Sequence, residues 1–372
     1  MINDAKFDKV SNINIKKEKV LIPAEVFIGD IPLLEGSYRM IKKSRKEISD
    51  VIHGTDDRVA VVVGPCSIHD TVAALEYANK LKKQASKFKN EIIIIMRVYF
   101  EKPRTTIGWK GLINDPDLDN SYNINKGLGM ARKLLSDLTD MGLPCATEFL
   151  DVITPQYFAE LISWGAIGAR TVESQVHREL ASGLSASIGF KNATNGDIQV
   201  AVDAIKSATN PHHFLSTTKS GSTAIFETKG NQDGHIILRG GASGTNFSKE
   251  NVDSAVEKMN KSGVKTKVMI DCSHGNSNKD HKNQKNVLKD ICGQIATSGD
   301  VFGVMIESDL VAGNQDINKK PLQYGQSVTD KCVDFEETIE MLEMLSDAVK
   351  ARRNNNKTST VSSDAESQIS LL

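Results

Sequence analysis

Short apolar runs rich in β-branched residues recur along the chain, and each run stops at a polar residue. Eight such runs end at or near Cys66, Arg97, Glu148, Arg170, Lys191, Arg239, His274 and Glu307. Runs of this length that are apolar throughout, without alternation, predict strands buried on both faces, which is typical of parallel strands covered by helices. Eight of them predict one closed (β/α)8 TIM barrel, a fold of the α/β class, whose active site lies at the carboxyl ends of its strands.

The segments between the runs predict helices. Apolar residues recur at helical spacing over residues 73–88, 127–142, 156–166 and 251–263. This alternation of strand and helix patterns supports the parallel barrel. Residues 212–230 break the rhythm with two β-rich pieces around Ser220 and Gly221, which predicts an inserted antiparallel hairpin.

We expect three regions along the chain. Residues 1–57 carry mixed charge and form an N-terminal extension that packs outside the barrel or onto a neighbouring subunit. Residues 58–352 form the barrel. Residues 353–372 are polar and rich in Ser and Asn, so we expect disorder there.

Composition excludes several classes of protein. The chain has 46 Lys plus Arg against 47 Asp plus Glu, a net charge of -1, so no global basic field attracts nucleic acid or an anionic membrane. No apolar run approaches the roughly 20 residues of a membrane span, and the first residues lack the apolar core of a secretory signal. Five singly scattered cysteines favour a reducing compartment. We therefore expect a cytoplasmic protein.

Four residues that can bind a metal fall at neighbouring strand ends. Cys66, His274 and Glu307 end the first, seventh and eighth runs, and Asp330 follows on the segment leaving the eighth. Closing the barrel makes the first and eighth runs neighbours. A thiolate, an imidazole and two carboxylates suit one divalent Mn, Fe, Co or Zn ion better than Mg or Ca. Taken singly, each residue also has an ordinary structural interpretation, such as a buried Cys after Pro.

Cations gather at the same ends of the predicted strands, namely Arg97, Lys102, Arg104, Arg170, Lys191 and Arg239. Phosphates and carboxylates fit such a set, because Arg binds them with a planar fork and Lys with a point charge. Lys191 ends an apolar strand, and desolvation there suits it to proton transfer. The alternative is structural ion pairing with Glu148, Glu173 and Asp271.

The segment that follows His274 is polar. Asn276, Asn278 and Lys279 come just past this candidate ligand. They either orient His274 or form a helix-capping loop.

Several long motifs carry a resemblance to a known family. They are GPCSIHD, MRVYFEKPRTTIGWKGLINDPDLDNS, GAIGARTVESQVHRELASGLS, GFKN, ILRGG, IDCSHGNSNKD and GVMIES. With them the chain resembles the type I 3-deoxy-D-arabino-heptulosonate 7-phosphate (DAHP) synthases over residues 26–352. The resemblance implies a barrel that condenses phosphoenolpyruvate with erythrose 4-phosphate, releases phosphate and uses one divalent metal ion.

The resemblance also assigns roles to residues. It implies that the metal ligands are Cys66, His274, Glu307 and Asp330. It implies phosphoenolpyruvate contacts at Arg97, Arg170, Lys191 and Arg239, with Lys102, Glu148, Gly168 and Ala169 close by. Erythrose 4-phosphate contacts fall on Lys102, Pro103, Arg104 and Thr105. The implied catalytic residues are Cys66, Lys102, Lys191 and His274.

Regulation is implied as well. In this family an aromatic amino acid binds outside the barrel, near the inserted hairpin and the N-terminal extension of a neighbouring subunit, so a homodimer or homotetramer is expected. The matching positions are Pro155, Gln156, Leu180, Leu184, Ser185, Phe214 and Ser216. Phenylalanine is favoured over tyrosine as effector, because tyrosine-sensitive members tend to have Gly where this chain has Ser216. Two alternatives to this function remain open. The chain could be a catalytically silent amino acid sensor or partner subunit, or it could be a sister synthase that uses arabinose 5-phosphate.

Overall fold

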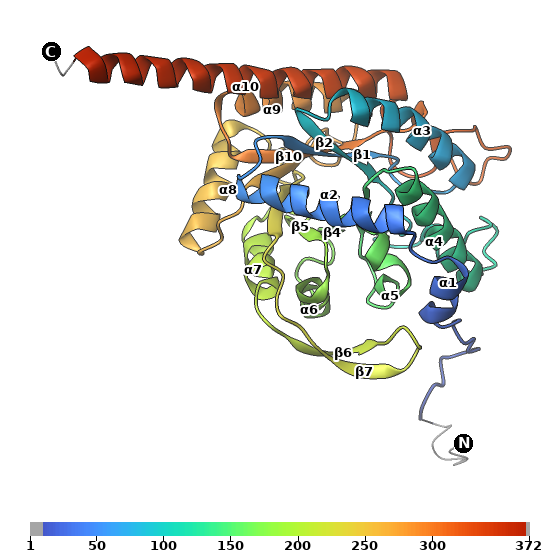
Figure 1. Cartoon of the computed structure of the whole chain (residues 1–372). Helices are drawn as coiled ribbons and strands as arrows, with labels where there is room; N and C mark the ends of the chain where they lie inside the picture. Colours follow the sequence, from blue (N-terminus) through green and yellow to red (C-terminus); the bar gives the residue numbers. More distant parts are fainter. Residues whose placement is uncertain (1–9, 370–372) are drawn as a thin grey trace.

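Eight parallel strands close into a barrel in the order β1-β10-β9-β8-β5-β4-β3-β2, which confirms the predicted TIM barrel (Figure 1). The computed structural model describes residues 10–369 of the chain and the side chains of residues 10–357. The strands are β1 (Val59–Gly64), β2 (Ile92–Arg97), β3 (Cys145–Glu148), β4 (Trp164–Ile167), β5 (Ser187–Lys191), β8 (Gly234–Leu238), β9 (Val268–Asp271) and β10 (Val301–Glu307).

The barrel strands are buried on both faces, which explains why their sequences do not alternate. In β1, Val61 pairs with Val304 of β10 on one side and Ile94 of β2 on the other. Val61 and Val63 belong to the large core between the strands and the surrounding helices. Ala60 and Val62 belong to a second, smaller core inside the barrel. Both sets of side chains lose water, so apolar residues are favoured at every position.

Helices cover the outside of the barrel between successive strands. They are α3 (Thr71–Lys87), α4 (Ile124–Asp140), α5 (Pro155–Phe158), α6 (Gln175–Gly183), α7 (Gln199–Ala208), α8 (Lys249–Lys261), α9 (Gln284–Thr297) and α10 (Phe335–Ile369). Asp70 caps the start of α3, since its side chain accepts hydrogen bonds from the amides of Val72 and Ala73.

The helix expected over residues 156–166 is wrong in its second half. The helical part is α5 followed by one 3-10 turn, η2 (Ala159–Leu161), and β4 begins at Trp164. Trp164 is fully buried inside the barrel, where its indole Nε1 donates to His235 Nε2 at 3.1 Å. This tertiary contact outweighs the local helical spacing.

The N-terminal extension contains two helices, α1 (Ala24–Asp30) and α2 (Glu35–His53). Ile48, Val51 and Ile52 of α2 are fully buried and belong to the same core as the inward-facing side chains of the barrel. Figure 1 shows α2, in blue, lying across one end of the barrel. The extension therefore packs on the barrel of its own chain, and α2 closes the end opposite the strand carboxyl termini.

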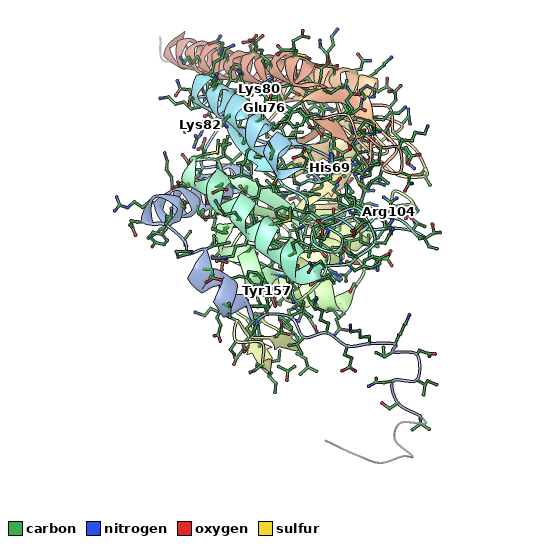
Figure 2. All side chains as sticks on the ribbon, turned by 90° about the vertical axis from the view of Figure 1, so that its right-hand side faces the viewer. His69, Glu76, Lys80, Lys82, Arg104 and Tyr157 are labelled. Carbon is green, nitrogen blue, oxygen red and sulfur yellow. The ribbon has the colours of Figure 1, made fainter. Side chains whose placement is uncertain are left out.

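The segment before α1 runs along α4 and α5. The Ile22 amide donates to Asn125 Oδ1 at 3.0 Å, and the Tyr157 hydroxyl donates to the Ile22 carbonyl at 2.8 Å. Figure 2 labels Tyr157 beside the blue ribbon of this N-terminal segment. The amide of Glu25 also donates to the Lys219 carbonyl at 2.9 Å, which ties α1 to the tip of the hairpin.

The predicted antiparallel hairpin is confirmed. It consists of β6 (His213–Thr217) and β7 (Thr223–Glu227), with Phe214 opposite Phe226 and Ser216 opposite Ala224. In Figure 1 the hairpin arches away from the barrel beside α6.

The C-terminal helix is longer than composition suggests. Residues 353–369 continue α10, although their polar composition predicts disorder. At the start of this stretch Arg353 donates to Asp57 Oδ2 at 2.6 Å and to the Asn90 carbonyl at 2.8 Å. Two short strands, β11 (Val311–Asn314) and β12 (Gln326–Ser327), and a 3-10 turn, η3 (His281–Asn283), complete the elements. Within the described part of the chain, no helix has the length and apolarity needed to cross a membrane.

Candidate active site

A cavity of about 510 Å³ opens at the carboxyl ends of the barrel strands. Most of the residues predicted to bind substrate line it, namely Lys102, Pro103, Arg104, Thr105, Glu148, Gly168, Ala169, Arg170, Lys191 and Arg239. His274 and Asp330 line it as well. The topology brings these residues together because parallel strands place all their carboxyl ends at one face of the barrel.

Arg97 is the predicted substrate contact that does not line this cavity. Its side chain is 1% exposed, and its Nη2 donates to Glu307 Oε1 at 3.0 Å. Its guanidinium lies 3.6 Å from the centre of the Tyr99 ring, and its Nε donates to the Pro65 carbonyl at 3.1 Å. Arg97 therefore holds a candidate metal ligand in place from beneath the site.

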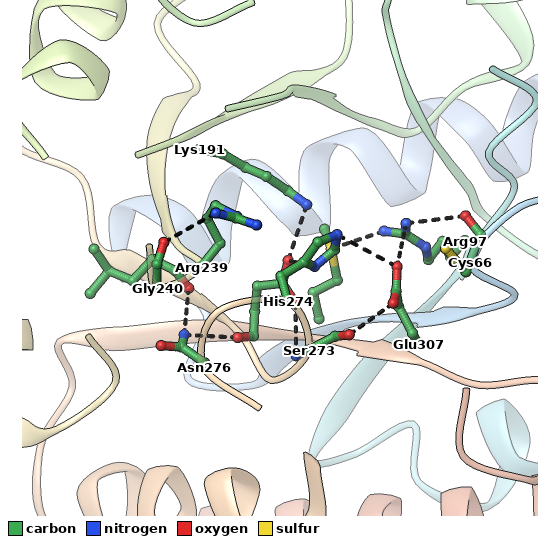
Figure 3. A network of polar contacts seen from close by, with 12 residues as sticks. Cys66, Arg97, Lys191, Arg239, Gly240, Ser273, His274, Asn276 and Glu307 are labelled. Carbon is green, nitrogen blue, oxygen red and sulfur yellow. Dashed lines mark hydrogen bonds and ion pairs between the residues drawn. The ribbon is translucent and has the colours of Figure 1, made fainter. Parts of the chain in front are cut away.

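Three of the four predicted metal ligands converge. One ligand atom from each of Cys66, Glu307 and Asp330 lies within 4.8 Å of the others, and Cys66 Sγ is 3.7 Å from Asp330 Oδ2. The fourth, His274, lies beside this group, with its Nε2 at 3.7 Å from Glu307 Oε1 (Figure 3). A thiol and two carboxylates converging next to an imidazole fit a divalent transition metal.

The surroundings of Glu307 and Cys66 favour an ionised carboxylate beside a protonated thiol. Burial opposes ionisation of Glu307, but His274, Arg97 and Lys102 hold the pKa of its carboxyl down at about 2. Burial and the neighbouring Glu307 raise the pKa of the Cys66 thiol to about 11. A bound divalent cation would reverse that preference, because metal ligation favours the thiolate.

Lys102 contacts this cluster directly. Its Nζ lies 3.1 Å from Cys66 Sγ and 3.1 Å from the Cys66 carbonyl oxygen. Burial opposes the charge on Lys102, but the nearby Cys66, Glu307 and Asp330 raise the pKa of its ammonium above the usual value. Lys102 is thus a protonated donor between the candidate metal ligands and the cavity.

Asp271 joins Lys191 to His274. Lys191 Nζ donates to Asp271 Oδ2 at 3.0 Å, and His274 Nδ1 lies 2.9 Å from the same oxygen (Figure 3). Burial opposes ionisation of Asp271, but His274 and Lys191 hold the pKa of this carboxyl well below its usual value. The ion-pairing alternative therefore applies to Lys191. It does not apply to Glu148, whose buried Oε1 has no hydrogen-bond partner among the described residues.

The wall of the cavity next to Glu148 is shaped by glycine. A Cβ atom at Gly168 would lie 2.2 Å from Glu148 Oε1, so any larger residue would displace this carboxylate. Next to it, Arg170 Nε donates to Thr105 Oγ1 at 3.3 Å and so joins the loops that follow β4 and β2. Figure 2 labels Arg104, from the same β2 loop, on the right-hand side of that view.

Asn276 organises the segment after His274. Its Nδ2 donates to the carbonyls of Leu238 at 3.1 Å and Asp271 at 2.9 Å, so it fixes this segment to β8 and β9 (Figure 3). Asn278 and Lys279 have φ angles of 54° and 59°, in the left-handed region. The segment is therefore held by specific hydrogen bonds and is not a helix cap.

Sequence reasoning missed several residues of the site. Ser273 donates from its hydroxyl to Glu307 Oε2 at 2.8 Å, and Thr194 and Lys331 line the cavity. Lys279, which the sequence suggests only as a residue that orients His274 or belongs to a helix-capping loop, lines the cavity as well. The place of Ser273 directly before His274, a predicted metal ligand, is the signal for it. Lys331 offered none, because its place depends on the path of the chain after β10.

The positions implied to bind an effector lie on the outside of the barrel. Pro155 and Gln156 lie in α5, Leu180 lies in α6, Leu184 and Ser185 follow α6, and Phe214 and Ser216 lie in β6. The Ser182 and Thr228 hydroxyls are 2.7 Å apart and connect α6 to the base of the hairpin. These elements form a region separate from the residues that line the cavity.

A family model, a solved structure and curated relatives all show similarity of this chain to one family of enzymes. The model of the DAHP synthetase I family matches residues 35–343. A phospho-2-dehydro-3-deoxyheptonate aldolase structure from Francisella tularensis SCHU S4 superposes with a TM-score of 0.91 at 80% identity, covering 91% of this chain and 99% of that one. The Phe-sensitive aldolase of Escherichia coli K12 is 55% identical over 92% of this chain and 98% of its own length. The tyrosine-inhibited aldolase of Schizosaccharomyces pombe is 52% identical over 91% of this chain and 92% of its own. The chain therefore belongs to the DAHP synthetase I family.

Proposed function

We propose that this protein condenses phosphoenolpyruvate with D-erythrose 4-phosphate and water to give DAHP and inorganic phosphate, the first step of the shikimate pathway. The observation that carries the proposal is the cavity, whose walls combine Lys102, Arg104, Arg170, Lys191 and Arg239 with His274 and Asp330 of the candidate metal site. Two phosphorylated substrates need such a set of cations, and membership of the family is consistent with it.

The cations on opposite walls suit the two substrates. Arg170, Lys191 and Arg239 come from neighbouring strands β4, β5 and β8 and provide forks and a point charge for the carboxylate and phosphate of phosphoenolpyruvate. Arg104 and Thr105 come from the loop after β2 and suit the phosphate of the sugar. Holding both substrates in one cavity brings C3 of phosphoenolpyruvate to the aldehyde carbon and removes much of the entropic cost of their encounter.

Cys66, His274, Glu307 and Asp330 are the residues that would hold the divalent metal ion, of which Mn, Fe, Co and Zn suit the donor set. When bound, such an ion supplies a Lewis acid that polarises a carbonyl oxygen.

Lys102 and the remaining cations manage protons and charge. The new bond joins C3 of phosphoenolpyruvate to the aldehyde carbon, whose oxygen then takes a proton, and Lys102 lies on the cavity wall with an ammonium to donate. Water adds to C2, and cleavage of the C2–O bond releases phosphate. Lys191, held by Asp271, and Arg239 are placed to offset charge on the leaving group.

Feedback inhibition by an aromatic amino acid completes the proposal. The relatives include Phe-sensitive and tyrosine-inhibited proteins. Phenylalanine is the favoured effector of this chain because Ser216 occupies the position at which the resemblance predicts this preference. The proposed pocket lies between α5, α6 and the hairpin, on a homodimer or homotetramer of a cytoplasmic enzyme.

The test measures the consumption of phosphoenolpyruvate by the protein in the presence of erythrose 4-phosphate. The phosphate that is released is measured in parallel. We expect one phosphate per phosphoenolpyruvate consumed, and inhibition by phenylalanine at concentrations where tyrosine has little effect. Turnover with arabinose 5-phosphate but not with erythrose 4-phosphate would identify a sister synthase. Effector binding in calorimetry without any turnover would identify a silent sensor.

A further inference from the structure

Two lysines on the cavity wall have no partner and no role in the reaction described above. Lys279 and Lys331 both line the cavity. In the part of the chain that the structure describes, neither ammonium makes a hydrogen bond or an ion pair. Some exposed lysines elsewhere do pair with a carboxylate, as Lys249 does with Asp253 at 2.8 Å. Two unpaired ammonium groups facing the same cavity leave an uncompensated positive potential there.

The two lysines share one side of the barrel mouth. Lys279 follows β9 and Lys331 follows β10, and these strands are neighbours in the barrel. In the closed ring of strands β9 and β10 lie opposite β3 and β4, so the two lysines are on the other side of the mouth from Arg170, which follows β4. Arg239 follows β8, the neighbour of β9, and Arg104 follows β2, one strand beyond β1. Lys279 and Lys331 thus extend the set of cations that the proposed function assigns to the two substrates.

The backbone presents Lys279 in an unusual conformation. Its φ of 59° lies in the left-handed region, which costs a side chain without a local hydrogen bond about 1 kcal/mol. The segment is nevertheless fixed, because the Lys279 amide donates to the His274 carbonyl at 2.8 Å and Asn276 fixes the preceding turn to β8 and β9. The fold thus holds the Lys279 backbone in place beside a candidate metal ligand.

The cavity lining carries more positive than negative side chains. Its lining contains seven lysine and arginine side chains and two carboxylates: Lys102, Arg104, Arg170, Lys191, Arg239, Lys279 and Lys331 against Glu148 and Asp330. Each phosphate monoester brings up to about two negative charges, and phosphoenolpyruvate adds a carboxylate. The two substrates together bring up to about five negative charges. With Glu148 and Asp330 this makes about seven, which balances the seven cations of the lining only if Lys279 and Lys331 are counted.

We propose that Lys279 and Lys331 form an anion subsite for a phosphate group at the β9–β10 side of the cavity. The group belongs either to an arriving phosphorylated substrate or to the inorganic phosphate that the reaction releases. This inference rests on the proposed function, since it adds a subsite to that cavity.

The test compares Lys279→Ala, Lys331→Ala and the double variant with Lys282→Ala. Lys282 is an exposed lysine three residues past Lys279 that does not line the cavity, so its removal changes net charge equally. For each protein the KM of both substrates, kcat and the inhibition constant of inorganic phosphate are measured at low and high salt.

We expect the double variant to raise at least one of these three constants by about tenfold, with a smaller effect on kcat and a weaker dependence on salt. A raised KM for one substrate assigns the subsite to that substrate, whereas a raised phosphate inhibition constant alone assigns it to the product. Lys282→Ala should match the parent protein, and Lys279→Arg with Lys331→Arg should restore most of the loss.

All three constants within twofold of the parent in the double variant would overturn the subsite while leaving the proposed function intact. If the parent protein shows no turnover, the proposed function fails, and calorimetric titration of the same proteins with inorganic phosphate decides the subsite. Equal phosphate affinity in the parent and the double variant would then reject it.

Discussion

Trp164 donates its indole Nε1–H to His235 Nε2 at 3.1 Å inside the barrel, and both residues are fully buried. The other ring nitrogen of His235 donates to the Asp233 carbonyl at 3.0 Å. These two hydrogen bonds require a neutral imidazole, in which Nδ1 carries the proton and Nε2 accepts. A second proton on Nε2 would face the indole N–H of Trp164. Burial accordingly lowers the pKa of His235 to about 4.

This pair predicts an acid-sensitive stability. Above pH 6.5 His235 is neutral in both states and contributes nothing. As the pH falls below 6.5 the unfolded chain binds a proton that the folded chain refuses until about pH 4. The free energy of unfolding should fall by about 2 kcal/mol from this group between pH 7.5 and pH 5. Urea unfolding at a series of pH values measures it.

His235→Gln is the matched variant, because it keeps hydrogen-bonding capacity and removes the titration. The variant should be less stable at pH 7.5 but should lose about 2 kcal/mol less than the parent on going to pH 5. Parallel pH profiles for the two proteins would show that His235 does not carry the acid sensitivity.

Removal of metal should abolish activity and lower thermal stability. Chelation followed by addition of Mn or Co should restore both, since a ligand at a hundredfold excess over its Kd adds about 2.7 kcal/mol to stability. Cys66→Ser should weaken metal binding measured by calorimetry, because the soft thiolate is lost. Cys292→Ser, in α9 and outside the cluster, should bind metal like the parent. Equal metal affinity in Cys66→Ser would remove Cys66 from the ligand set.

Lys102→Met should lower kcat by about 100-fold or more, since the cavity loses the ammonium that sits 3.1 Å from Cys66 Sγ. Lys110→Met, an exposed lysine at the end of the same loop, should retain near-normal turnover. Steady-state kinetics at saturating metal and substrates gives the comparison. Near-normal kcat in Lys102→Met would exclude it as the proton donor.

Arg132→Met should destabilise the fold by about 3 kcal/mol. Arg132 is fully buried in α4, where its Nη1 donates to the Tyr157 carbonyl at 2.6 Å and its Nε to the Ile31 carbonyl at 2.9 Å. Its removal leaves these acceptors unpaired. Lys133→Met, the exposed neighbour that pairs with Asp137, should cost less than about 0.5 kcal/mol. Equal losses in urea unfolding would contradict this account.

The sequence predicts the barrel well because each strand is buried on both faces and is therefore an apolar run without alternation. The same argument places Lys191, His274 and Glu307 at strand ends, and the structure puts them around one mouth. Predictions from the local pattern are wrong where a contact with a distant part of the chain determines the position of a residue. Trp164 begins a strand inside a helical pattern because it packs in the barrel interior, and Arg97 turns under Glu307, away from the cavity lining.

Other features of the site depend on chain paths that no local pattern reveals. The sequence suggests Asp271 only as an ion-pair partner of a cation, whereas in the structure it contacts both Lys191 and His274. Lys331 reaches the cavity because the chain returns to the barrel mouth after β11 and β12. A single sequence gives the distance along the chain between residues such as Lys331 and the barrel strands. It does not show that the segment after β12 folds back to the barrel mouth.

The burial of Ile48, Val51 and Ile52 changes where the catalytic unit begins. These side chains complete the interior of the barrel, so a cut at residue 57 would expose its core to water and remove the plug from one end. The family match begins at residue 35, which is the first residue of α2. The smallest piece of this chain that folds as a barrel should accordingly start no later than Glu35, the first residue of the helix that closes the barrel interior.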